Sequence, residues 1–386
     1  MAVTTIAKEV VGPNKLRLML RSKIPVLVER ARDGSEAAAR ELADLAFEND
    51  ENQVAMVAAG AIPVLVDLLG SEARVEAAWA LANLAVNASI DMKASVPGLA
   101  KLALEGRDEE ARVEAARALA ILAFNDSRVA IDAMPAFLDL AKTGESSRAR
   151  DLVADALAHV GAETGDFSSA IPVLVDLLRD SRDQAAVALQ SLALANPDNQ
   201  KMIVDAGALP TLVDLSERGN KDAVGALANL AHNNADNQKA IAAAGAIPAL
   251  VELLASKDAC EIAAGAVANL AALEDNRSII LESGAIPGLL DIVACGTDEA
   301  KEFAAGALAN LALQDDVFFH PDALVDLATR GTDGAKVEAA WALANLAVNN
   351  PQITGLVVPV LLDLARDDNP VAKHEATLAL RTLGFS

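Results

Sequence analysis

The sequence predicts an all-α solenoid, and three observations lead to this fold class. The segment VEAAWALANLAVN occurs at 75–87 and again, letter for letter, at 337–349. Hydrophobic residues make up 53% of the chain and aromatic residues only 3%, so its apolar mass is mainly Ala, Leu and Val, which suits close helix packing. Two short sequence markers also recur along the whole chain, as they do in helical repeat proteins.

The two markers define the repeating unit. One is the position that asparagine fills in Ala-Leu-Ala-Asn-Leu-Ala, which we call the asparagine slot. The other is a proline, often in Ile-Pro, about twenty residues earlier. The slot falls at Asp44, Asn83, Ile121, His159, Ser191, Asn229, Asn269, Asn310, Asn345 and Thr382. A single domain of ten repeats is therefore expected, at about 1–49, 50–88, 89–125, 126–162, 163–196, 197–234, 235–273, 274–313, 314–350 and 351–386.

Each full repeat is expected to contain three helices. In the seventh repeat the first helix (237–245) ends at a glycine, and the second (246–254) carries proline in its first turn. This order is favoured because glycine tolerates a left-handed residue after a helix, and proline lacks a donor that the first turn does not need. The third helix (260–273) is the longest. Segments 161–169 and 314–322 depart from the pattern.

The phrase NQ…I…GAIP.LV.LL…AA.ALANLA resembles the armadillo repeat of β-catenin, importin-α and the plant and fungal armadillo scaffolds. The match is fullest at 51–87, 199–233, 237–273 and 276–314. This resemblance implies a right-handed α-solenoid of about ten three-helix repeats, with the third helices lining a concave groove. It also implies that Trp-x-x-x-Asn pairs of the importin-α kind, here Trp79/Asn83 and Trp341/Asn345, face a peptide.

A polar stripe on the third helix supplies the candidate binding residues. Helical spacing places Glu76, Trp79 and Asn83 together, on a face away from the leucine stripe. A carboxamide both donates and accepts hydrogen bonds, so it suits the main chain of an extended peptide, and a tryptophan face suits Lys or Arg stems. The candidate peptide-binding residues are Glu76, Trp79, Asn83, Asn87, Asn125, His159, Asn229, Asn233, Asn269, Asn310, Glu338, Trp341, Asn345 and Asn349.

Structural roles compete with each of these assignments. The slot asparagines would also serve to tie neighbouring helices together. Asparagines near helix ends, such as Asn87, often serve a turn. Acidic residues that open the third helix, among them Glu76, Glu114, Glu302 and Glu338, either favour the helix N-terminus or form an acidic wall that selects basic ligands. His159 occupies a slot and is equally well explained as a surface substitution.

Composition argues against several functional classes. A net charge of −23 leaves no excess of cations for a nucleic-acid backbone. No catalytic constellation, metal site or cofactor motif is visible, and no apolar run is long enough for a membrane span. Cys260 and Cys295 are expected to be free, buried thiols. We therefore expect a non-enzymatic monomer of the cytoplasm or nucleus.

The favoured function is a scaffold that holds an extended peptide, with Lys/Arg-containing segments as the candidate ligands. Three alternatives remain open. One is a structural assembly module that uses its convex face or its ends. The others are an importin-α-like cargo adaptor, which a full tryptophan ladder would favour, and an engineered or consensus-like array, suggested by the exact duplication at 75–87 and 337–349.

Overall fold

The computed structural model describes residues 21–144, 147–164, 168–180, 183–315, 317–367 and 369–385. These residues are mostly helical and contain no strand. The chain divides into two compact units, unit 1 (Met1–Ala188) and unit 2 (Leu189–Ser386), and the boundary falls within one helix. Each unit is described by itself.

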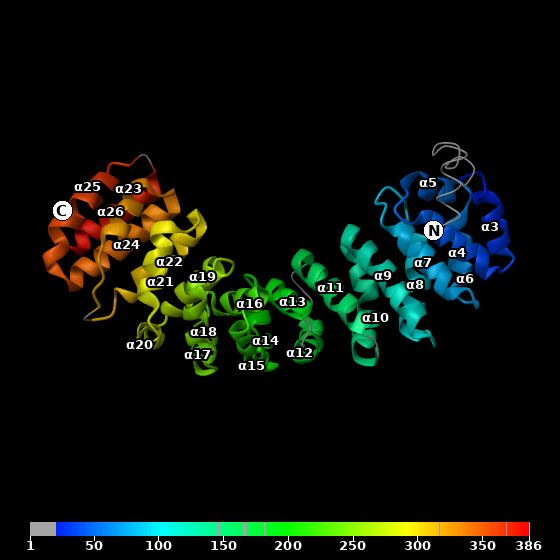
Figure 1. Ribbon diagram of the computed structural model, residues 1–386, viewed down its shortest axis with the longest axis horizontal. Helices are drawn as coiled ribbons and strands as arrows, with labels where there is room; N and C mark the ends of the chain where they lie inside the picture. Colours follow the sequence, from blue (N-terminus) through cyan, green and yellow to red (C-terminus); the bar gives the residue numbers. More distant parts are fainter. Residues whose placement is uncertain are drawn as a thin grey trace. The chain divides into compact units, whose positions relative to one another are not determined.

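Unit 1 is a succession of helices that follow one another in chain order, drawn from blue to green in Figure 1. Its helices are α3 (Ile24–Arg32), α4 (Glu36–Ala46), α5 (Asp50–Ala58), α6 (Ala61–Leu68), α7 (Arg74–Ala85), α8 (Val96–Glu105), α9 (Glu109–Asn125), α10 (Ser127–Thr143), α11 (Ser147–Thr164) and α12 (Ile171–Arg179). Helix α13 (Asp183–Ala193) contains the boundary, and short 3₁₀ turns precede α8 (Lys93–Ser95) and α12 (Ser168–Ala170).

Unit 2 repeats the same organisation, from green to red in Figure 1. Its helices are α14 (Pro197–Asp205), α15 (Leu209–Glu217), α16 (Lys221–Ala231), α17 (Ala235–Ala243), α18 (Ala246–Glu252), α19 (Cys260–Ala271), α20 (Glu274–Glu282), α21 (Ala285–Cys295), α22 (Asp298–Leu311), α23 (Asp322–Arg330), α24 (Asp333–Asn349), α25 (Thr354–Leu364) and α26 (Pro370–Thr382). Two 3₁₀ turns are Leu253–Ala255 and Pro351–Ile353.

The predicted three-helix pattern appears in full in the second, sixth, seventh and eighth repeats. In the seventh, α17 ends before Gly245, whose φ of 86° is left-handed, and α18 then begins with Pro248 in its first turn. Glycine adopts such a φ without the clash that a Cβ would cause. The all-α armadillo solenoid class is confirmed.

Other repeats have fewer helices than the sequence suggests. The proline marker of the fourth repeat is Pro135, which by the repeat pattern should lie in the first turn of a second helix, but it lies inside the continuous helix α10. An internal proline removes one helical hydrogen bond and crowds the preceding turn. The buried side chains of Phe137 and Leu140 on α10 supply the packing that offsets this cost. Near the irregular segment 161–169, α11 continues to Thr164.

Alanine and leucine of the third helices form the core of each unit. Leu81 and Leu84 of α7 are fully buried, as the leucine stripe predicts. Successive third helices pack directly on one another, α4 on α7 and α7 on α9 in unit 1, and α16, α19, α22, α24 and α26 in turn in unit 2. Small alanine side chains permit this close approach and place the polar stripes of adjacent helices side by side.

The Asn-Gln pair that opens the first helix braces these third helices. Asn199 Nδ2 donates to the Leu192 carbonyl at 3.0 Å, at the end of the preceding third helix. Gln200 Nε2 donates to the carbonyl of Asn229 in the following third helix at 2.9 Å. Gln53 makes the same contact with the Asn83 carbonyl at 3.1 Å. In the second and sixth repeats, the main-chain carbonyl at the asparagine slot is therefore fixed by a glutamine from the first helix of the same repeat.

Two expectations about the chain's chemistry have different outcomes. Both cysteines are free, but Cys260 is half-buried and Cys295 is exposed, so the prediction of buried thiols is wrong. Cys295 ends α21, where the helix turns toward solvent. No described helix is by itself long and apolar enough to cross a membrane, although three sharply bent helix pairs satisfy length and composition together.

Candidate functional site

The slot asparagines form a regular row in unit 2, and Asn83 makes the same contact in unit 1. Each described Nδ2 donates to the carbonyl of the residue that precedes the slot in the previous repeat, so each asparagine joins two third helices. The bonds are Asn83 to Ala43 at 3.0 Å, Asn229 to Gln190 at 2.9 Å, Asn269 to Ala228 at 3.0 Å, Asn310 to Ala268 at 3.2 Å and Asn345 to Ala309 at 2.9 Å. This regularity supports a tethering role, but it uses only one of the two carboxamide N–H groups.

The slot asparagines of the two units differ in whether their Oδ1 atoms remain available as hydrogen-bond acceptors. Asn83 was expected to point outward, but its side chain is buried, and its Oδ1 accepts a hydrogen bond from Arg117 at 3.3 Å. In unit 2 the slot asparagines are half-buried, and their Oδ1 atoms accept no hydrogen bond from a described residue. These free acceptors have the chemistry needed to bind the N–H groups of an extended chain.

The second row of asparagines makes mainly local contacts. Asn87 accepts from the Ser89 amide at 3.1 Å, Asn125 donates to Ile121 at 3.3 Å, and Asn233 adopts a φ of 52° beside His232. Asn349 instead reaches the previous repeat, where it donates to Ala312 at 2.9 Å. His159 lies on α11, and its side chain is outside the described residues.

Trp79 and Trp341 lie four residues before their slots, and both are half-buried. Elsewhere this tryptophan position is filled differently in the two units. In unit 1 it holds arginine in the neighbouring repeats, Arg40 and Arg117. In unit 2 it holds Gly225, Gly265 and Gly306 in the three repeats before Trp341. The surroundings of two identical segments therefore differ in charge and in volume.

The acidic residues of unit 1 are paired within the protein. Glu76 is buried and binds Arg40 of the previous repeat at 2.5 Å. Glu114 is buried as well and binds both Arg117 at 2.8 Å and Arg148 at 2.5 Å. Their carboxylates already hold cations, so a basic ligand would compete with the protein's own arginines.

Glu338 of unit 2 has the same sequence around it as Glu76 but no arginine partner. The residue that corresponds to Arg40 is Gly306, and a Cβ built on Gly306 would lie 3.1 Å from Glu338 Oε2. Glu338 makes no ion pair with a described residue. Burial raises the pKa of its carboxyl, and the like charges of Glu302 and Glu375 raise it further. We call Glu302, Glu338 and Glu375 the acidic row of unit 2.

The carboxylates of the acidic row are not arranged to coordinate a metal ion. Within the described part of the chain, no group of three or more His, Cys, Asp or Glu side chains is arranged to hold a metal ion. Lys336, the nearest lysine along α24, binds Asp367 at 3.0 Å instead of the row. The row is therefore an uncompensated set of carboxylates on three consecutive third helices.

Comparisons with known proteins agree with this architecture. The armadillo/β-catenin-like repeat model matches residues 49–86 and 234–272, and a HEAT-repeat model matches 96–193. The HEAT match covers repeats in which two α-helices replace three. The comparison with curated proteins gives no match.

Solved structures show the same family. The crystal structure of an engineered protein is 32% identical, with a TM-score of 0.82, and the match covers 94% of this chain and 99% of that chain. A designed armadillo repeat protein in complex with the peptide (KR)4 is 27% identical, with a TM-score of 0.50, covering 55% of this chain and 98% of that chain. The chain belongs to the armadillo-repeat family and is a helical repeat scaffold.

Sequence analysis missed the residues that distinguish the two units. Arg40 and Arg117 occupy the same position of the repeat as Trp79, and Gly306 occupies it one repeat before Trp341. The available signal was the residue four positions before the asparagine slot in the preceding repeat. It shows which carboxylate has an arginine within reach.

Proposed function

We propose that the chain is a non-enzymatic scaffold of the cytoplasm or nucleus that binds an extended, Lys/Arg-containing peptide of a protein partner along the asparagine row of unit 2. The observation that carries this proposal is the missing partner of Glu338. In the identical segment of unit 1, Arg40 binds Glu76. Gly306 removes that side chain from unit 2, so an arginine or lysine of a ligand takes its place.

Three groups of one repeat have complementary roles in this proposal. Glu338 binds the cationic group of the ligand. The like charges of Glu302 and Glu375 destabilise the ionised form of Glu338, and the positive charge of the ligand offsets this repulsion. Trp341 packs its ring against the aliphatic stem or the charged head of the ligand side chain. Asn345 keeps its tether to Ala309 and offers Oδ1 to a main-chain N–H.

Asn310 and Asn269 extend the same main-chain contacts into the preceding repeats. Each is tethered to its neighbour and has an Oδ1 that accepts from no described residue. At the tryptophan position beside them, the Phe303 ring lies against Gly265 and the Glu338 carboxylate lies against Gly306, so a ligand would meet these two side chains there. The designed armadillo protein with bound (KR)4 supports this choice, because alternating Lys and Arg is a basic extended peptide.

The experiment is a fluorescence titration of basic, neutral and acidic peptides of equal length against wild type and Trp341→Ala. We expect the basic peptide to bind most tightly, and its affinity to fall with added salt because part of the attraction is Coulombic. Trp341→Ala removes a cation–π contact worth about 0.5–2 kcal/mol, which corresponds to a loss of about 2–30-fold. The matched control is Trp79→Ala, in the same thirteen-residue segment, which should change the affinity little.

Equal affinity for the three peptides would contradict the proposal. Binding that resists salt and both tryptophan substitutions would instead favour the alternative of a structural assembly module. A peptide that binds through Trp79 alone would move the ligand to unit 1.

A further inference from the structure

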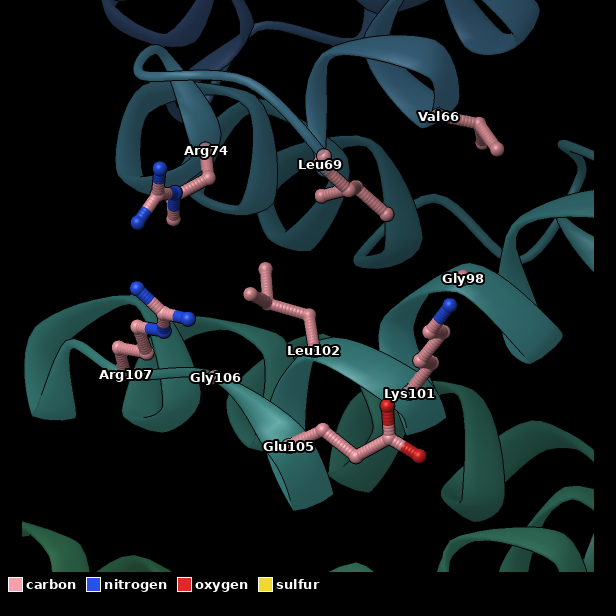
Figure 2. A pocket seen from close by; sticks show the side chains of 10 residues that line it. Val66, Leu69, Arg74, Gly98, Lys101, Leu102, Glu105, Gly106 and Arg107 are labelled. Carbon is pink, nitrogen blue, oxygen red and sulfur yellow. The ribbon is translucent and has the colours of Figure 1, made fainter.

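A hollow in unit 1 lies outside the asparagine row and is lined by the protein's own cations. It is formed by the end of α6 and the following turn, the start of α7, and one face of α8 (Figure 2). Its volume is about 500 Å³. That volume lies in the range of small-molecule sites, which is about 300–1,000 Å³.

Positive charge predominates in this hollow, although the chain as a whole is strongly acidic. Arg74, Lys101 and Arg107 line it, and Glu105 is the acidic residue of the lining. None of the three basic side chains makes an ion pair with a described residue. Most arginines of the protein pair with a carboxylate, as Arg112 does with Asp139 at 2.8 Å. Three cations without a described ion-pair partner therefore line one hollow.

The two arginines are placed to act on one ligand group. In Figure 2 the guanidinium groups of Arg74 and Arg107 face each other across the hollow, while Glu105 points away from them beside Lys101. Arg74 is held by a 2.6 Å hydrogen bond from Nε to the Ser71 carbonyl, which leaves its Nη atoms without a described partner. One fixed and one exposed guanidinium thus flank the same space.

The turn that carries Arg107 is fixed by a close backbone approach. A Cβ on Gly106 would lie 2.5 Å from the Leu102 carbonyl oxygen and 2.8 Å from Cγ of Arg112. Only glycine fits without a shift of the backbone. Beside the two guanidinium groups, Leu69 and Leu102 supply apolar surface to the hollow.

We propose that this hollow binds an organic phosphate monoester, with the phosphate between Arg74 and Arg107 and its organic part on Leu69 and Leu102. Three basic groups and one acid give a local charge that matches a phosphate of about −1.5 to −2. A phosphate monoester carries more negative charge than a carboxylate and has three terminal oxygens instead of two, so it forms stronger charge-assisted hydrogen bonds with the two guanidinium groups. The volume exceeds that of a bare ion, so the ligand carries an organic group.

The test is isothermal titration calorimetry of the full chain with phenyl phosphate. We expect saturable binding that weakens at least about tenfold in Arg74→Gln/Arg107→Gln, because charge-assisted hydrogen bonds from both groups are lost. Arg30→Gln/Arg32→Gln removes two exposed arginines from α3 and is the matched control, with affinity unchanged. Phenylacetate, which carries a carboxylate on a similar apolar body, should bind at least about tenfold more weakly.

A second arm identifies the source of the phosphate. A phosphotyrosine pentapeptide that binds more tightly than phenyl phosphate assigns the site to a phosphorylated protein partner, and equal affinity assigns it to a free organic phosphate. The proposal is overturned if phenyl phosphate does not saturate, if phenylacetate binds as tightly, or if the double variant binds like wild type.

Discussion

At the scale of single residues, the most informative comparison is between Glu76 and Glu338. Both occupy the second position of VEAAWALANLAVN, so local sequence cannot distinguish them. Glu76 binds Arg40, whereas Glu338 is partly desolvated over Gly306 and repelled by two other glutamates. The same side chain therefore has opposite electrostatic consequences for the fold.

Glu338→Gln should raise the free energy of unfolding at neutral pH. The pKa of Glu338 is raised in the folded state, so between the ordinary glutamate value of about 4.3 and the raised value the folded chain binds more protons than the unfolded chain. Wild-type stability therefore falls as the pH increases through this window. The advantage of the variant should appear at neutral pH and vanish below it, as measured by urea unfolding across pH 4 to 8.

Glu76→Gln is the matched control, and the opposite sign is expected. It removes the buried partner of Arg40 and should lower the urea midpoint at neutral pH. A shift of the urea midpoint in the same direction for both variants would contradict the claim that Arg40 binds Glu76 while Glu338 has no cationic partner among the described residues.

Loss of a slot asparagine should cost stability according to its contacts. Asn269→Ala removes one hydrogen bond to Ala228 and should lower the free energy of unfolding by about 1 kcal/mol. Asn83→Ala removes two hydrogen bonds, the one to the Ala43 carbonyl and the one that Arg117 donates to Oδ1, so a cost of about 2 kcal/mol is expected. Denaturant unfolding of both variants checks the order, and equal costs would contradict it.

At the scale of helices, the sequence predicted the positions of the helices better than the contacts that their side chains make with other repeats. The repeated segment forms almost all of α7 and the C-terminal part of α24, and the glycine–proline order correctly placed α17 and α18. Pro135 misled the prediction because tertiary packing carries α10 across it. The outward direction of Asn83 was also wrong, because Ala43 and Arg117, from other repeats, enclose it.

Two glycine substitutions should have opposite effects on helix stability. Gly265 lies inside α19, where a Cβ would meet only the Phe303 ring at 3.6 Å, an ordinary contact. Gly265→Ala should therefore stabilise the chain by about 0.5–1 kcal/mol through helix propensity. Gly106→Ala should destabilise it, because a Cβ would clash with the Leu102 carbonyl. Thermal melts that show the same sign for both would contradict this interpretation.

At the scale of the whole molecule, each repeat is stabilised mainly by its neighbours in the chain. Helix α22 packs between α19 and α24, whereas α26 packs on α24 and α25 and leaves Val371 exposed. Terminal repeats of such arrays have one neighbour fewer and open more readily. Hydrogen exchange followed by mass spectrometry should be faster in α26 than in α22. Equal protection of the two helices would contradict the expectation.

The repeat pattern was sufficient to predict the family, but it did not predict the division into units 1 and 2. That division depends on contacts between helices, which the spacing of markers does not contain. The boundaries of ten repeats remain a prediction. The cation-lined hollow was also missed, because Arg74 and Arg107 belong to different repeats and share no motif.

The central claim is that a basic peptide binds where Glu338 lacks an arginine. The most direct measurement is the dissociation constant of one Lys/Arg peptide for wild type, Glu338→Gln and Glu76→Gln at neutral pH. We expect Glu338→Gln to weaken binding about tenfold, the loss of one charge-assisted contact, and Glu76→Gln to leave it within about twofold. Unchanged affinity in Glu338→Gln, or a larger loss in Glu76→Gln, would contradict the account.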